Sequence, residues 1–205
     1  MINKTIEELV MVDIFYIWDN KGVEFAIPKL RTLYFERYDK LTDMEDKRLI
    51  LYNLMAAEME NGNIEAVKIY SKQLKQDMDS TENYKENYKN LYAKMLTFYK
   101  ESNLDVLSHN EINEINKFHY EIFKNYTDPN DIKFLDMLSA KFNLNLFNKN
   151  FSIVIEVVQT MLIHRANSTE YHTLLKQMYE DIKKVDNLLY QTILKLDMEY
   201  TKIII

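Results

Sequence analysis

The sequence predicts an all-α protein made of stacked antiparallel helix pairs, followed by a long C-terminal helix. Two observations predict this fold class. The 205 residues include 2 glycines and 2 prolines, whereas a sheet protein needs such turn residues every few positions. Apolar residues also recur at helical spacing along almost the whole chain, and short asparagine-rich turns interrupt them.

The composition indicates a folded protein of a reducing compartment. Hydrophobic residues make up 47% and charged residues 28%, as in ordinary globular domains. The lack of cysteine removes disulfides, thiolate metal ligands and cysteine nucleophiles. The apolar N-terminal stretch contains acids, unlike a signal peptide or a membrane span. With a net charge of −6 and no basic cluster, we expect a cytoplasmic protein that binds neither membranes nor nucleic acid directly.

Four helices are expected in the first part of the chain. Thr5 begins the first, because Glu8 stands at capping-box spacing from it, and Gly22 ends it. Pro28 falls near the first turn of the second helix or kinks it. The third and fourth flank the turn Asn61-Gly62-Asn63. The four expected ranges are residues 5–18, 23–39, 45–60 and 64–78.

Five more helices follow, separated by Ser- and Asn-containing turns. Ser108-His109-Asn110 precedes the second of them, and Asp128-Pro129-Asn130 the third. Asn167, with Glu170 at capping-box spacing, begins the last. The expected ranges are residues 83–101, 110–125, 131–146, 151–165 and 167–200.

The turns are evenly spaced along the chain. Those at Asn20, Asn61, Asn103 and Asn148 lie 41, 42 and 45 residues apart, and each separates the two helices of one pair. This weak self-similarity favours a two-helix repeat over a plain helical bundle of evenly sized helices. The predicted organisation is therefore a repeat array over residues 1–166 and a long C-terminal helix over 167–205, which packs on the array or on a second subunit.

Residues 45–74 resemble a tetratricopeptide repeat (TPR). The resemblance lies in residue types: an aromatic-leucine group, a small pair, a polar turn and an apolar stripe after it. These are Tyr52-Asn53-Leu54, Ala56-Ala57, Asn61-Gly62-Asn63 and Ala66-Val67-Tyr70. The resemblance implies a right-handed stack of about four antiparallel helix pairs, a TPR-like solenoid.

The first seventy residues resemble the N-terminal part of bacterial Rap-type and related intracellular quorum-sensing peptide receptors. Trp18, Ala26, the acidic stretch of residues 43–46 and the Leu-Tyr-rich stretch of residues 49–52 stand where those receptors carry similar groups. The resemblance implies that the chain binds a short peptide in the concave face of its array. Asp46 stands where Rap-type phosphatases carry a Gln, so the resemblance implies no phosphatase activity.

Asparagine and tyrosine side chains are the candidate binding residues. A carboxamide can donate to C=O and accept from N–H of an extended peptide, which makes Asn53 the first candidate, with surface or capping roles as the alternative. Tyr84, Tyr88, Leu91, Tyr92, Met95 and Tyr99 form one stripe, which belongs to the core or to an adaptable binding surface. The predicted binding set is Tyr52, Asn53, Tyr88, Asn90, Tyr92 and Asn145.

The last expected helix carries an apolar stripe in which steps of three and four residues alternate. This pattern is typical of a coiled coil, but it also fits packing on the preceding helices. The predicted dimerisation set is Leu175, Met178, Ile182, Val185, Leu189 and Leu196.

No motif in the sequence nominates a catalytic, cofactor or metal site. His109, His119, His164 and His172 stand at no recognised ligand spacing. We therefore expect a non-catalytic regulatory protein that binds a short peptide or a partner protein in a helical groove. The alternative is a protein inhibitor, for example one that a mobile element encodes against a host enzyme or defence complex, which blocks its target with a surface.

Overall fold

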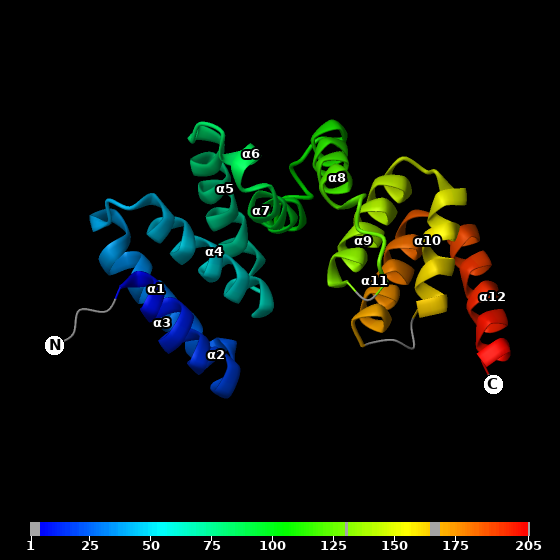
Figure 1. Ribbon diagram of the computed structural model, residues 1–205, viewed down its shortest axis with the longest axis horizontal. Helices are drawn as coiled ribbons and strands as arrows, with labels where there is room; N and C mark the ends of the chain where they lie inside the picture. The colour runs from blue at the N-terminus through cyan, green and yellow to red at the C-terminus, as the bar shows by residue number, and fades with distance from the viewer. Residues whose placement is uncertain (1–4, 130, 165–168, 205) are drawn as a thin grey trace. The chain divides into compact units, whose positions relative to one another are not determined.

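The computed structural model describes residues 5–129, 131–164 and 169–204 (Figure 1). These residues form helices joined by short turns, and no strand is found among them, which confirms the all-α prediction. The helices pack against their neighbours in the chain. The chain divides into two compact units, Met1–Leu107 and Ser108–Ile205.

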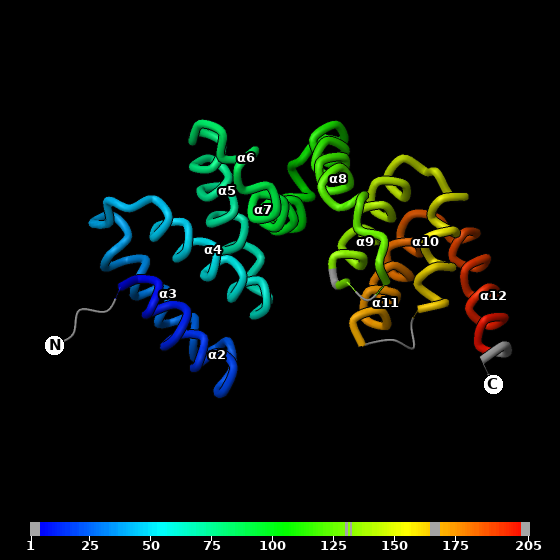
Figure 2. Tube along the Cα trace, viewed as in Figure 1, coloured from blue at the N-terminus to red at the C-terminus, as the bar shows by residue number. Residues whose placement is uncertain are grey.

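Unit 1 is a succession of helices in which each packs on the next. Helix α2 packs on α3, α3 on α4, α4 on α5 and α5 on α7, and Figure 2 follows the chain through these reversals. Tyr88 divides the expected helix over 83–101 into two. The elements are α1 (Ile6–Glu8), the π-helix η1 (Leu9–Ile14), α2 (Phe15–Lys21), α3 (Val23–Arg37), the 3-10 turn η2 (Tyr38–Lys40), α4 (Met44–Glu60), α5 (Ile64–Ser80), α6 (Tyr84–Asn87) and α7 (Lys89–Ser102).

The first helical segment begins as predicted but contains a turn that the sequence analysis did not foresee. The Glu8 N–H donates to Thr5 Oγ1 at 3.1 Å, and the Thr5 N–H donates to Glu8 Oε2 at 2.9 Å, which confirms the capping box. The middle of the segment widens into a π-helix, where the Phe15 N–H reaches back to the carbonyl of Val10. Such π segments often occur at functional sites.

Apolar side chains and ion pairs between neighbouring helices hold unit 1 together. Arg31 on α3 donates to the fully buried Glu58 on α4, with Nε–Oε1 at 2.7 Å. Pro28 lies beyond the first turn of α3, which continues through it to Arg37. The fully buried apolar residues include Val10, Leu30, Ile50, Leu54, Met55, Val67, Leu74 and Met95.

The turns of two predicted helix pairs share one geometry. In the α4–α5 turn, Gly62 has φ 75°, and the Asn63 N–H donates to the Glu58 carbonyl at 2.8 Å. In the turn at Asn148, Lys149 has φ 58°, and the Asn150 N–H donates to the Asn145 carbonyl at 2.8 Å. The resemblance that the sequence shows between these segments therefore extends to their hydrogen bonds.

Unit 2 has its own core. Helix α8 packs on α9, α9 on α10, and both α11 and α12 pack on α10 and on each other. Its elements are α8 (His109–Phe123), α9 (Ile132–Phe147), α10 (Phe151–His164), α11 (Thr169–Val185) and α12 (Asn187–Ile204). Its core includes Phe134, Leu138, Phe142, Val154, Val158, Met161, Leu162, Tyr171, Met178, Ile182 and Ile193.

The prediction of one long C-terminal helix is wrong, because Asp186 interrupts it. Asp186 Oδ1 accepts a hydrogen bond from the Leu189 N–H at 2.8 Å, so its side chain caps a new helix, α12. Apolar residues before and after the break join the core of unit 2. The predicted N-cap at Asn167 lies outside the described residues.

The two helices of the predicted third pair fall in different units. Helix α7 packs on α5 within unit 1, and α8 packs on α9 within unit 2. The turn after Asn103 therefore coincides with the boundary between the units. Ser108 begins α8 with a capping box to Glu111.

Candidate functional site

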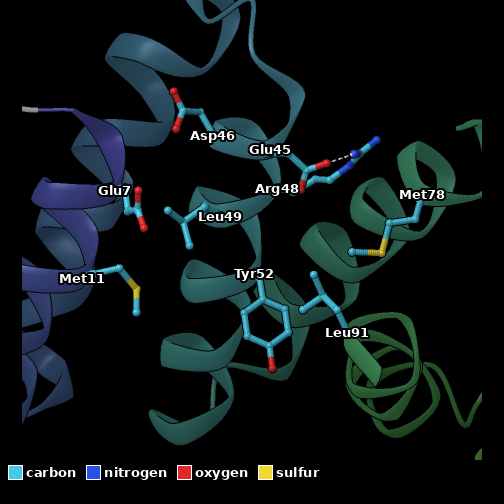
Figure 3. Close-up of a pocket in the computed structure, with 9 residues that line it drawn as sticks. All are labelled: Glu7, Met11, Glu45, Asp46, Arg48, Leu49, Tyr52, Met78 and Leu91. Atoms are coloured by element: carbon cyan, nitrogen blue, oxygen red, sulfur yellow. Dashed lines mark hydrogen bonds and ion pairs between the residues drawn. The ribbon is translucent and has the colours of Figure 1, made fainter. Parts of the chain in front are cut away.

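A cavity of about 380 Å³ opens in unit 1. Side chains from α1, η1, α4, α5 and α7 surround it (Figure 3). Apolar groups and charged groups both contribute to the lining. The lining residues are Glu7, Met11, Glu45, Asp46, Arg48, Leu49, Tyr52, Met78 and Leu91.

The first helix of the first pair forms one wall of the cavity. Ile6, Val10 and Ile14 are buried and stand four residues apart, so they anchor this segment in the core. In a regular α-helix, repeated four-residue steps would drift around the axis by about 40° each. The step from Val10 to Ile14 falls within the π-helix η1, which is wider than an α-helix. Glu7 on α1 and Met11 on η1 lie beside the anchoring row and point toward α4 (Figure 3).

Helix α4 forms the floor. Glu45, Leu49 and Tyr52 follow one another at spacings of four and three residues, so they share one face of the helix. Leu49 and Tyr52 are half-buried. The other faces of α4 are packed in the core through residues such as Ile50 and Leu54. Met78 on α5 and Leu91 on α7 close the opposite wall.

Arg48 connects the floor to the far wall. It is 5% exposed, and its Nε donates to Asp77 Oδ2 at 2.5 Å. Its two terminal nitrogens donate to Glu45 Oε1 at 2.5 Å and to Thr81 Oγ1 at 2.6 Å. The guanidinium also lies 4.3 Å from the centre of the Tyr84 ring. With these partners Arg48 fixes α4 against α5 and α6, and its charge is already neutralised.

Tyr84 supports Arg48 with its ring, while its hydroxyl makes no hydrogen bond to a described residue. The side chain is 2% exposed, and its hydroxyl has no hydrogen-bond partner in the structure. Burial raises the pKa of the Tyr84 phenol to about 12, with a smaller contribution from Glu45. The ring therefore acts as an apolar and cation–π support for Arg48.

Two carboxylates on one side of the cavity differ from Glu45, because neither pairs with a cation among the described residues. Glu7 and Asp46 take part in no ion pair with a described residue, whereas Glu45 pairs with Arg48. Burial raises the pKa of the Asp46 carboxyl, and the negative charges of Asp43 and Glu7 raise it further. Both acids lie in first helical turns, where the helix dipole would favour a negative charge.

One member of the predicted binding set lines the cavity, and it is Tyr52. Its ring meets Phe98 edge-on, with centroids 6.0 Å apart, and burial raises the pKa of its phenol. The neighbouring Asn53 is 5% exposed and does not line the cavity. Its Nδ2 donates to the Leu49 carbonyl one turn earlier, at 2.8 Å. Asn53 thus stabilises its own helix, and a role as a peptide clamp stays a prediction.

The other predicted residues lie elsewhere. Tyr88 and Asn90 are exposed at the start of α7, and Tyr88 stacks on Tyr84 with ring centroids 4.7 Å apart. Tyr92 is buried, and its hydroxyl donates to Asp79 Oδ1 at 2.5 Å. Asn145 belongs to unit 2, where it is 8% exposed and accepts a hydrogen bond from Asn150 Nδ2 at 3.2 Å. These contacts give Tyr92 and Asn145 structural roles.

Most of the predicted dimerisation residues lie in the core of unit 2. Leu175, Met178, Ile182 and Leu189 are buried there, and Leu196 packs against the same cluster. Val185 is 47% exposed. The apolar stripe is therefore explained by packing within the unit, and dimerisation through it stays a prediction.

The sequence analysis missed Glu7, Met11 and Arg48. A signal for Arg48 was present, because an arginine in the apolar run RLILYNLM falls on a face that must be buried. No sequence signal marked Glu7 or Met11, because Ile6, Val10 and Ile14 stand at the four-residue spacing that a regular helix also uses for its buried face.

Comparisons with protein-family models, with curated proteins and with solved structures find no match. Within the described ranges, no helix combines the length and apolar character that crossing a bilayer requires. The described residues also include no group of three or more His, Cys, Asp or Glu side chains placed to hold a metal ion.

Proposed function

We propose that this protein is a non-catalytic interaction module that binds a short peptide, or an extended segment of a partner protein, in the cavity of unit 1. One observation supports this function above the others. Apart from Met78, each lining residue comes from the first helix of a predicted pair, namely the α1–η1 segment, α4 or α7. In stacked helix pairs, the first helices line one continuous face, and that face is where such arrays bind extended ligands.

The shape and chemistry of the cavity fit a side chain with its flanking backbone. Its volume lies within the range of small-ligand sites and suits one or two large apolar side chains. Met11, Leu49, Tyr52 and Leu91 supply apolar and adaptable contact surface. The resemblance of the first seventy residues to Rap-type peptide receptors supports the same class of ligand, and it favours a TPR-like right-handed stack.

Neighbouring residues on η1 offer a matched test. Met11 is 47% exposed and lines the cavity, whereas Val12 is 62% exposed and does not. A Met11→Trp substitution fills the cavity, and Val12→Trp adds the same bulk outside it. Peptides selected from a random phage-displayed library on the full chain should bind the Val12→Trp variant normally. The Met11→Trp variant should bind them at least tenfold more weakly in isothermal titration calorimetry.

Two outcomes would contradict the proposal. In the first, selected peptides bind both variants equally, so they occupy another surface. In the second, the library yields no binder, and a folded partner protein binds the Met11→Trp variant as well as the unaltered chain. The second outcome would instead favour the inhibitor hypothesis, in which an outer surface blocks a target.

A further inference from the structure

The charges around the cavity are unequally compensated. Arg48 is bonded to both Glu45 and Asp77, so its positive charge is not available to a ligand. Glu7 and Asp46, on the opposite side, pair with no cation in the part of the chain that the structure describes. The lining therefore contains three carboxylates and one guanidinium, and the guanidinium is already neutralised.

The apolar part of the cavity lining places a second, independent requirement on the ligand. Met11, Leu49, Tyr52 and Leu91 line the same cavity as Glu7 and Asp46, and a bare cation would leave their apolar surface uncovered. A ligand that covers both regions must present an apolar side chain and a positive charge close together. An acidic peptide would face uncompensated repulsion at Glu7 and Asp46.

From this juxtaposition we infer that the occupant of the cavity is a basic peptide segment, in which a lysine or arginine stands beside a large apolar residue. The basic group lies between Glu7 on α1 and Asp46 on α4, and the apolar side chain lies over Tyr52 and Leu91. This inference rests on the proposed function, because it names the ligand class of the same cavity.

Occupation of this kind would also relieve a repulsion in the free protein. Burial and the charges of Asp43 and Glu7 raise the pKa of Asp46. A lysine or arginine beside Asp46 would stabilise its ionised form. Part of the binding energy would then come from removing an unfavourable interaction within unit 1.

The test uses a pool of synthetic peptides that vary in one charged or polar residue and in the apolar residue beside it. Each peptide places Lys, Arg, Gln or Glu beside Leu, Met or Phe in an otherwise Gly-Ser background. The full chain is incubated with the pool, and retained peptides are identified by affinity selection with mass spectrometry. Peptides with Lys or Arg should be enriched at least tenfold over their Glu counterparts. Raising the salt concentration should reduce this preference.

Variants with neutral side chains distinguish binding at this site from attraction of basic peptides to the negative charge of the whole protein. The Glu7→Gln/Asp46→Asn double variant should lose the preference for Lys and Arg. The Glu36→Gln/Glu82→Gln double variant removes the same charge from exposed positions outside the cavity, and it should keep the preference. Thermal unfolding of both variants verifies that each is folded, so a lost preference cannot be attributed to unfolding.

Three outcomes would overturn the inference in distinguishable ways. If peptides bind without charge preference but Met11→Trp still abolishes binding, the inference fails and the proposed function stands. If no peptide of the pool is retained, the inference fails and the random-library selection decides the proposed function. If Met11→Trp binds all retained peptides normally, both fail. If the chain forms a dimer in solution that Met11→Trp dissociates, a second copy occupies the cavity, and the basic-peptide inference fails.

Discussion

At the scale of single residues, Arg48 is the side chain on which the cavity depends. It is 5% exposed, and its guanidinium is held by Asp77, Glu45 and Thr81 over the ring of Tyr84. Breaking a buried ion pair by removing one partner leaves the other charge desolvated, which makes such changes strongly destabilising. Arg48 therefore matters because its loss would leave Asp77 without its cation.

The Arg48→Met variant should lose about 3 kcal/mol in the free energy of unfolding of unit 1. Urea unfolding followed by tryptophan fluorescence measures this directly, because the single tryptophan, Trp18, belongs to unit 1. The matched change is Lys75→Met, which removes a more exposed ion pair with Asp79 in the same unit and should lower stability by less than about 1 kcal/mol. Equal small losses in both variants would contradict the role assigned to Arg48.

Asp46 should have the opposite effect on stability. Its pKa in the folded protein lies above the ordinary value of 3.8, so the folded state binds this proton more tightly than the unfolded state does. Stability therefore falls as pH rises from that value through the raised folded pKa. The Asp46→Asn variant should be more stable than the unaltered chain at neutral pH, and the difference should vanish in acid. A destabilised variant at neutral pH would contradict this account.

At this scale, the sequence identified the segment that lines the cavity but not which of its residues face the cavity. Tyr52 was predicted and lines the cavity. Asn53 follows it directly but points into the core, where its amide bonds to the Leu49 carbonyl. Helical periodicity places neighbours about 100° apart, and an uncertainty of one position is enough to exchange a lining residue for a buried one.

At the scale of elements, most helices could be predicted, because capping and turn residues lie within a few positions of the helix ends that they determine. The capping box at Thr5 and the turn at Gly62 were predicted in this way, and the Ser108 turn was predicted without its capping box. The π turn of η1 and the break at Asp186 were missed. The break at Asp186 has a local signal, the cap that its side chain forms with the Leu189 N–H, whereas no local pattern marked the π turn.

Asp186 gives an element-scale prediction. Its side chain caps α12 through the Leu189 N–H, so Asp186→Ala should lower the free energy of unfolding of unit 2 by about 1 kcal/mol. Circular dichroism during thermal or urea unfolding measures this change. Lys195→Ala, at an exposed position within α12, serves as the comparison and should have little effect. A gain in stability on Asp186→Ala would indicate that one continuous helix is the preferred state after all.

At the scale of the whole molecule, the chain consists of two compact units, each with its own buried core. The evenly spaced turns predicted the helix pairs but not this division. The reason is that the turn after Asn103 resembles the others in sequence, whereas α7 and α8 find their packing partners within different units. Contacts distant in sequence, rather than the turn itself, set the boundary.

Fragments of residues 1–107 and 108–205 should each fold cooperatively, because each contains a complete set of packed helices. Circular dichroism and unfolding of the two separate fragments test this expectation. The first fragment should also retain peptide binding, since the cavity lining lies within it. A fragment that stays unfolded would contradict the independence of its core.

The central claim is that the cavity of unit 1 binds a basic peptide, and methyl NMR of the methionines tests it most directly. Met11 and Met78 line the cavity, whereas Met161 and Met178 lie in the core of unit 2. Titration of the methyl-labelled full chain with a selected Lys-containing peptide should shift the Met11 and Met78 signals and leave the Met161 and Met178 signals unchanged. Binding that shifts the unit 2 methionines, or that leaves Met11 and Met78 unmoved, would contradict the claim.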